Sequence, residues 1–241
     1  MIYFAKRNLK EIIRDPLTVL FGLGFPVVIL LLLTAIQSNI PVSMFELSHL
    51  TPGIAVFGLS FMTLFSATLI SRDRETAFLQ RLFTTPLTAA DFILGYTLPI
   101  LPLSVLQCVI TFIVAIILGL KITIGILYCT VFIIPVSIFY IALGLLCGSL
   151  LSVKQTGGIC GALLTNLSAW FSGIWFDINL IGGVFKKIAN ALPFIHAVEL
   201  ERAVLKGELL SALPHLIIVL IYATAILCLA VFSFLRKMKQ A

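Results

Sequence analysis

The chain has 241 residues, of which 61% are hydrophobic and only 11% are charged, and its mean hydropathy is +1.18. A soluble domain of this length needs a largely polar surface, so the composition excludes a soluble globular protein and indicates an integral membrane protein. The net charge of +6 follows from where lysine and arginine lie relative to the membrane, and we do not take it as a sign of nucleic-acid binding.

Residues 2–15 alternate apolar side chains with lysine and arginine. This pattern is typical of an amphipathic helix in the membrane interface, with its apolar side towards the acyl chains and its basic side chains among the headgroups. Pro16 favours a sharp turn into the membrane, because proline restricts the residue before it. We therefore predict an N-terminal interface helix over 2–15, with membrane lipids as its partners.

Six long apolar runs predict six transmembrane helices, because about 20 apolar residues cross the hydrocarbon core of a bilayer. The third and fourth runs are longer than one crossing needs, so we expect them to tilt, kink or extend beyond the bilayer. The predicted fold is an all-α integral membrane protein with one domain over 1–241. The runs cover residues 17–36, 51–70, 92–120, 122–151, 157–175 and 213–235.

A polar segment between the second and third runs, residues 71–91, holds six charged residues. On a helix over 72–83, four apolar side chains share one face, because residues three and four apart are neighbours. Pro86 prevents easy continuation of this helix. The pattern predicts a short amphipathic helix that lies on the lipid surface, docks on a protein partner, or does both in part. The apolar face consists of Phe78, Leu79, Leu82 and Phe83.

Eleven of the 16 lysine and arginine residues fall on one side of the predicted membrane. Cytoplasmic segments carry an excess of these residues. We therefore predict a multi-pass protein of the cell membrane, inner or plasma, with both termini and residues 72–83 in the cytoplasm. The eleven are Lys6, Arg7, Lys10, Arg14, Arg72, Arg74, Arg81, Lys154, Arg236, Lys237 and Lys239, and the other side has Lys121, Lys186, Lys187, Arg202 and Lys206.

None of the six runs contains Asp, Glu, Lys or Arg. Ion-coupled transporters and membrane enzymes usually need such groups within the bilayer, so we predict no catalytic site. The five cysteines lie in apolar runs and the three histidines are scattered without metal-ligand spacing, so we predict no metal site. The chain also lacks a G-x-x-x-x-G-K-[ST] phosphate loop, so the energy for any transport must come from elsewhere.

The fifth run combines small residues with polar ones. Gly157 with Gly161, and Gly158 with Ala162, have the spacing that lets helices approach closely, within the subunit or across a dimer. An asparagine is costly against lipid, so Asn166 is expected to face protein or a cavity. Polar residues here and in the third run either form interhelical hydrogen bonds or contact substrate. The candidates for a translocation path or dimer interface are Gln107, Gly161, Thr165, Asn166 and Ser168.

The segment before the last run, residues 176–212, has helical features. Pro193 suits a helix start, Gly207 suits a helix end, and Glu199 with Arg202 form an i, i+3 pair. We expect short helices at the outer mouth that restrict access from outside, with a plain solvated helix as the alternative.

Three stretches of the chain resemble the ABC-2 type permease family, the membrane subunits of ATP-binding-cassette exporters. Their order, spacing and predicted sidedness match as well as their residues. The stretches are "IIRDPLTVLFGLGFPVVILLLL" from Ile12, "RDRETAFLQRLFTTPLTAADFILG" from Arg72 and "ALPFIHAVELERAVLKG" from Ala191.

The resemblance implies a single ABC-2 type transmembrane domain with a cytoplasmic coupling helix at 72–83 and short outer half-helices before the last span. It implies a transporter of two permeases, either two copies of this chain or this chain and a relative, with two ATPase subunits. ATP and Mg belong to those subunits, so this chain is not itself an enzyme and binds no cofactor. Contact with the ATPase falls to Glu75, Phe78, Leu79, Arg81, Leu82 and Phe83.

The resemblance also implies export as the direction of transport. The charge-free runs and the lack of a large domain after the first run favour a hydrophobic or amphipathic substrate of drug-like, antibiotic or lipid type. Two alternatives stay open at this point. The first is a secondary transporter or channel. The second is a membrane subunit for assembly or sensing that transports nothing.

Overall fold

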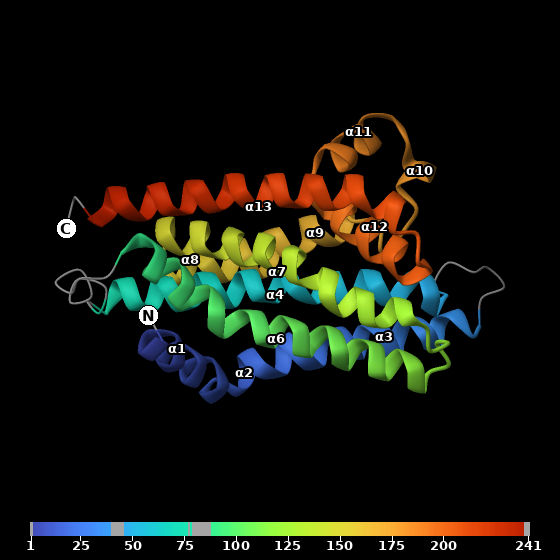
Figure 1. Cartoon of the computed structure of the whole chain (residues 1–241), viewed down its shortest axis with the longest axis horizontal. Helices are drawn as coiled ribbons and strands as arrows, with labels where there is room; N and C mark the ends of the chain where they lie inside the picture. Colours follow the sequence, from blue (N-terminus) through green and yellow to red (C-terminus); the bar gives the residue numbers. More distant parts are fainter. Residues whose placement is uncertain (1, 40–45, 77, 79–87, 239–241) are drawn as a thin grey trace.

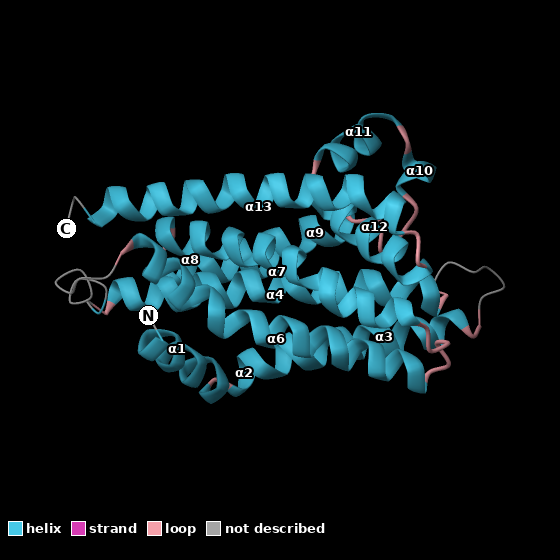
Figure 2. Cartoon of the chain, in the orientation of Figure 1, coloured by secondary structure: helices cyan, strands magenta, loops and turns pink. Residues whose placement is uncertain are grey.

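The computed structural model describes residues 2–39, 46–76, 78 and 88–238, and the regular structure in these ranges is entirely helical (Figures 1 and 2). The long helices run side by side as one elongated bundle. Their bounds are α1 Ile2–Arg14, α2 Pro16–Val19, the π-helix η1 Leu20–Gly24, α3 Phe25–Gln37, α4 Leu47–Glu75, α6 Ala89–Ile117, α7 Ile124–Leu150, α8 Val153–Thr156, the π-helix η3 Gly157–Leu164, α9 Thr165–Phe171, α10 Ile178–Ile181, α11 Gly183–Ala191, α12 Pro193–Lys206 and α13 Leu209–Met238.

The two ends of the bundle carry different elements (Figure 1). At one end lie α1, the last turns of α4 and α13, and the start of α6, and we call this the terminal end. At the opposite end lie α10, α11 and α12. Residues 72–76 therefore lie at the same end as α1 and the last turns of α13, as the sequence predicts.

Helix α4 is the centre of the bundle. In its most apolar stretch 89% of the residues are buried, against 17% in α13, which lies on the outside. Glycines of α7 let this helix pack closely on α4. A Cβ atom at Gly144 of α7 would lie only 2.5 Å from the side chain of Ser66 in α4. Thr63 Oγ1 donates to the carbonyl of Tyr140 at 2.8 Å and satisfies a hydroxyl that no water reaches.

Five helical segments are long and apolar enough to cross a membrane. They correspond to five of the six predicted runs, with longer helices at the second and last. The remaining run, 157–175, forms a helix over residues 153–171 that changes to π-helical geometry at Gly157–Leu164. This segment also carries Lys154, Gln155 and Asn166, and so is less apolar than the other five.

The predicted interface helix over 2–15 corresponds to the helix α1, but its apolar residues do not form one membrane-facing side. Phe4 and Ile12 are buried against the bundle, together with the polar Asn8, while Ile2 and Ile13 are exposed on another side. The helix therefore has one side for protein and one that remains available for lipid.

The segment before the last helix forms three short helices, as expected from the sequence, and α12 packs against α4, α7 and α13. Gly207, at φ +82°, ends α12 in the left-handed region that favours glycine. The alternative of a plain solvated helix is therefore wrong for α12, because its inner side is buried in the bundle.

Candidate functional site at the terminal end

The predicted coupling segment begins on the last turn of α4. This helix continues to Glu75, so the first four residues of the predicted helix over 72–83 belong to α4 instead. The predicted helix start at residue 72 is therefore wrong, because α4 continues through these charged residues beyond its own apolar stretch. Thr76 then ends α4, with its backbone N–H bonded to the carbonyl of Arg72 at 3.0 Å.

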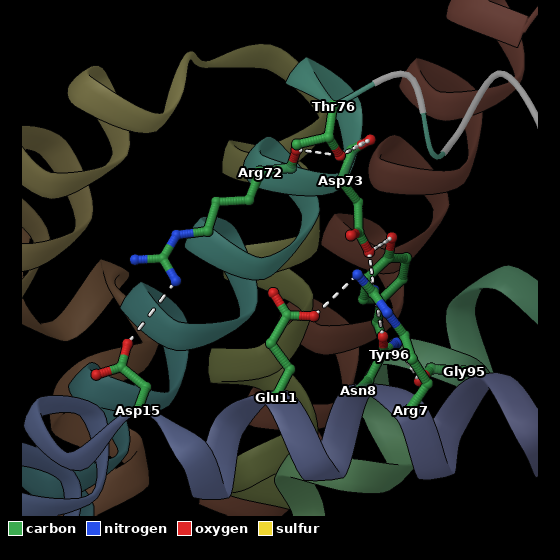
Figure 3. A network of polar contacts seen from close by, with 9 residues as sticks. All are labelled: Arg7, Asn8, Glu11, Asp15, Arg72, Asp73, Thr76, Gly95 and Tyr96. Atoms are coloured by element: carbon green, nitrogen blue, oxygen red, sulfur yellow. Dashed lines mark hydrogen bonds and ion pairs between the residues drawn. The ribbon is translucent and has the colours of Figure 1, made fainter.

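Asp73 is the centre of a polar network that joins three helices (Figure 3). It is only 1% exposed, and its Oδ2 accepts a hydrogen bond from Arg7 of α1 at 2.6 Å and one from the Tyr96 hydroxyl of α6 at 2.7 Å. Burial lowers the pKa of Arg7, but the hydrogen bond and charge of Asp73 outweigh this, so the pKa lies above its ordinary value. Each buried polar group in this pair therefore has a charged or hydrogen-bonding partner.

Helix α1 is fixed on the bundle by residues beside Arg7. The amide of Asn8, fully buried, donates to the carbonyl of Gly95 at 3.0 Å, and the Phe4 ring lies directly over Gly95. A Cβ atom at Gly95 would lie 2.1 Å from that ring, so only glycine lets α1 and α6 approach this closely. Arg7 also pairs with Glu11, one turn along α1, at 2.9 Å (Figure 3).

Two further charged residues of the last turn of α4, Arg74 and Glu75, reach towards α7 and α8. Arg74 donates to the carbonyls of Gly148, Ser149 and Leu151 at the end of α7, where a helix leaves carbonyls without partners. Glu75 accepts a hydrogen bond from the backbone N–H of Val153, in the first turn of α8, at 2.9 Å. One turn of α4 therefore contacts α1, α6, α7 and α8.

Phe78 extends this network towards the predicted coupling helix. The Arg7 guanidinium lies 4.3 Å from the centre of the Phe78 ring, and the Phe4 ring is 6.1 Å away. A cation over an aromatic face is stabilised by the ring quadrupole. Of the predicted contact residues, Phe78 thus contacts the network and Glu75 bonds α8 beside it, whereas Leu79, Arg81, Leu82 and Phe83 lie outside the described residues.

The structure does not gather the five candidate path residues into one site. Gln107 packs against Gly58 of α4 and donates to Thr111 at 3.1 Å, and Ser168 bonds the Tyr140 hydroxyl at 2.6 Å. Thr165 donates to a carbonyl of its own helical segment. Two further candidates lie elsewhere on that segment: Gly161 lines a cleft, and Asn166 is exposed, with its amide bonded to the Ala162 carbonyl at 2.8 Å.

The cleft beside Gly161 has a volume of about 480 Å³ and lies between η1, α4 and η3. Its walls are mostly apolar, including Phe21, Phe65 and Leu69, and Arg72 and Asp15 lie at its terminal end. The side chains of Arg72 and Asp15 form an exposed ion pair at 3.8 Å.

The three histidines come together at the opposite end, although the sequence separates them. His196 and His215 face each other with their Nδ1 atoms 2.8 Å apart, and His49 lines the same cavity. The interpretation as lone histidines is therefore wrong for this pair, because α12 folds back along α13. Among the described residues, no group of three or more potential metal-binding side chains occurs.

The chain matches one known protein family over most of its length. The sequence model described as "ABC-2 type transporter" matches residues 1–206, which include every helix from α1 to the end of α12. The chain belongs to the ABC-2 type transporter family. No curated protein shows significant sequence similarity to it. As an ABC-2 family member with several apolar helices of spanning length, the chain is a membrane component of a transporter, and the Asp73 network lies in the matched region.

Proposed function

We propose that this chain is the transmembrane permease subunit of an ATP-driven ABC exporter, and that its terminal end faces the cytoplasm of a cell membrane. The excess of lysine and arginine in α1, around residues 72–81 and after α13 supports this orientation. In this proposal residues 153–171 form a sixth crossing, in which the π-helical stretch permits close packing on α4.

The observation that carries the proposal is the position of the Asp73 network. The segment that follows α4 contacts it through Phe78 and Arg7, and Glu75 at the end of α4 bonds Val153 of α8. A partner that pushes on this segment would therefore move α1, α4 and α8 together. We propose that an ATP-binding-cassette subunit, one of two in the transporter, docks here and binds ATP and Mg, with Leu79, Arg81, Leu82 and Phe83 as further contacts.

The cleft between η1, α4 and η3 supports a hydrophobic or amphipathic substrate of drug-like, antibiotic or lipid type. Its apolar walls suit an acyl or aromatic group, and the polar rim at Arg72 and Asp15 suits a headgroup. We propose that this substrate leaves from the cytoplasm or the inner leaflet through the cleft.

A second permease, either a copy of this chain or a relative, covers the small-residue side of residues 153–171 in this proposal. Gly158, Ala162, Asn166 and Trp170 are all exposed there, each one helical turn from the next. Small residues permit close helix contact, and a covered Asn166 avoids the cost of an amide against lipid.

The test is reconstitution of the purified chain with a cognate ATP-binding-cassette subunit. We expect no ATP hydrolysis by the chain alone and membrane-dependent hydrolysis by the complex. Transport by the chain alone in ATP-free liposomes would instead support a secondary transporter or channel. A chain that binds no such ATPase and moves no solute would be an assembly or sensor subunit.

A further inference from the structure

Helix α12 carries an acidic side chain, Glu201, into the interior of the bundle. The residue is 0% exposed, and α12 packs against α4, α7 and α13 around it. It lies outside the five spanning helices, in a segment that reads from sequence as an outer loop region. The absence of charged residues from the six apolar runs therefore does not apply to this side chain.

The carboxyl group of Glu201 has no partner. Among the residues that the structure describes, neither Oε1 nor Oε2 accepts or donates a hydrogen bond. The thiol of Cys129 in α7, a weak donor, donates to the backbone carbonyl of Glu201 at 3.4 Å and lies close enough to interact with the carboxyl as well, but it brings no charge that would compensate a carboxylate. Cys108 of α6 is the other titratable group whose electrostatic interaction reaches this carboxyl.

The charged groups on the helices around α12 are engaged elsewhere. Arg202 donates to Glu199 at 2.8 Å and to the carbonyls of His49 and Gly173. His215 of α13 faces His196. Lys186 and Lys187 of α11 are exposed, His49 of α4 lies in the outer cavity, and α9 has no titratable side chain.

The crossing of α7 and α12 leaves little room at this point. A Cβ atom at Gly125 would lie 2.2 Å from the backbone oxygen of Leu205, one turn beyond Glu201. The two backbones therefore touch one helical turn away from Glu201. The crossing that buries Glu201 is thus held by close backbone contact, and it has to open before water reaches the side chain.

A buried carboxylate without a partner is strongly unfavourable, and such a group binds a proton instead. Burial raises the pKa of Glu201 well above its ordinary value. We infer that Glu201 is a proton-binding site that is occupied while α12 packs on α7, and that it releases its proton to water when the two helices separate. The carboxyl O–H bond breaks in that step, and water takes the proton.

This inference goes beyond the proposed function and does not depend on it. If the outer end opens during transport, α12 is the element that must move, and its movement then includes one protonation step. A transporter of this kind opens more easily to an alkaline exterior than to an acidic one, because loss of the proton favours the hydrated, separated state.

Infrared spectroscopy of the full chain in lipid nanodiscs tests the site directly. We expect the C=O stretch of a protonated carboxyl at neutral pH, and its loss in Glu201→Gln. The matched control is Glu199→Gln, two residues away in the same helix, which should keep the band. The absence of a protonated-carboxyl band in the wild type, or its persistence in Glu201→Gln, would overturn the inference.

The pH dependence of unfolding gives a second readout. Between the ordinary carboxyl pKa and the raised value in the fold, the folded state holds a proton that the unfolded state has lost. The stability of the wild type should therefore fall relative to Glu201→Gln as pH rises, by about tenfold in the unfolding equilibrium per pH unit. Glu201→Leu should show the same pH dependence of unfolding as Glu201→Gln. Agreement between the two variants excludes an effect that is specific to the glutamine amide. Parallel pH profiles in wild type and both variants would contradict a bound proton.

Discussion

Asp73 and Glu201 are both buried acids, 1% and 0% exposed. They lie at opposite ends of the bundle and differ in the partners of their carboxyl groups. Asp73 has Arg7 and Tyr96 within 2.7 Å, whereas no described residue bonds the carboxyl of Glu201. Burial alone therefore does not decide how an acid is accommodated. At the terminal end a partner from another helix compensates the charge, and at the opposite end we infer that a proton does.

The difference also distinguishes how each end is held together. The terminal end depends on specific polar contacts between helices that are far apart in sequence, and in the proposed function these contacts pass movement from one helix to the next. The α7–α12 crossing depends on close backbone packing at Gly125, so it is either closed and dry or open and hydrated. Three changes test this comparison.

The largest effect is expected from Arg7→Met, which leaves Asp73 buried without its cation. Asp73 is buried but the Arg7 side chain is 38% exposed, so the loss in the free energy of unfolding should be about 2.5 kcal/mol, less than for a fully buried pair. Equilibrium unfolding in mixed micelles measures it. Adding Asp73→Asn to Arg7→Met should recover much of the loss, because the uncompensated charge is then gone. Additive losses in the double variant would show that the two residues do not act as a pair.

The next effect concerns the crossing that buries Glu201. Gly125→Ala places a methyl group against the backbone of Leu205, which must shift, so we expect a loss of about 2 kcal/mol in stability. Gly24→Ala is the control, since the nearest atom there is 3.4 Å away on the flexible side chain of Leu20. Equal stability of the two variants would mean that α7 and α12 are not in close contact.

The smallest effect is expected from Tyr96→Phe, which removes one hydrogen bond to Asp73 but leaves Arg7 in place. A hydrogen bond to a charged group contributes about 1.5 kcal/mol or somewhat more. Tyr222→Phe loses a neutral bond to the carbonyl of Ala191 and should cost about 1 kcal/mol or less. If the two substitutions rank the other way in thermal unfolding, the Asp73 network is weaker than its geometry indicates.

The helices were largely predictable because long apolar runs dictate them. The all-helical fold and five of the apolar helices follow from hydropathy, as does α1. The π-helical geometry at Gly157–Leu164 did not, because hydropathy does not distinguish a π-helix from an α-helix. The end of α4 was also missed, since charge marks the edge of the membrane and not the end of a helix.

The candidate site was predictable only in its location. Charge placed residues 72–83 beside the termini, but the partner of Asp73 is Arg7, 66 residues away, and no local pattern identifies it. Asn8 on the buried side of α1 was the one available signal, because a polar residue there needs a partner. Glu201 was missed because α12 reads as part of an outer loop region. The roles of Leu79, Arg81, Leu82 and Phe83 stay predictions.

The central claim is that movement enters the chain where the segment after α4 meets the Asp73 network. Its most direct test is ATP hydrolysis by the complex of the chain with its ATPase subunit, measured with Phe78→Asp. We expect normal membrane insertion but loss of permease-dependent hydrolysis, whereas Leu180→Asp, an exposed apolar-to-acid change at the opposite end, should behave as wild type. Normal assembly and undiminished hydrolysis with Phe78→Asp would contradict the claim.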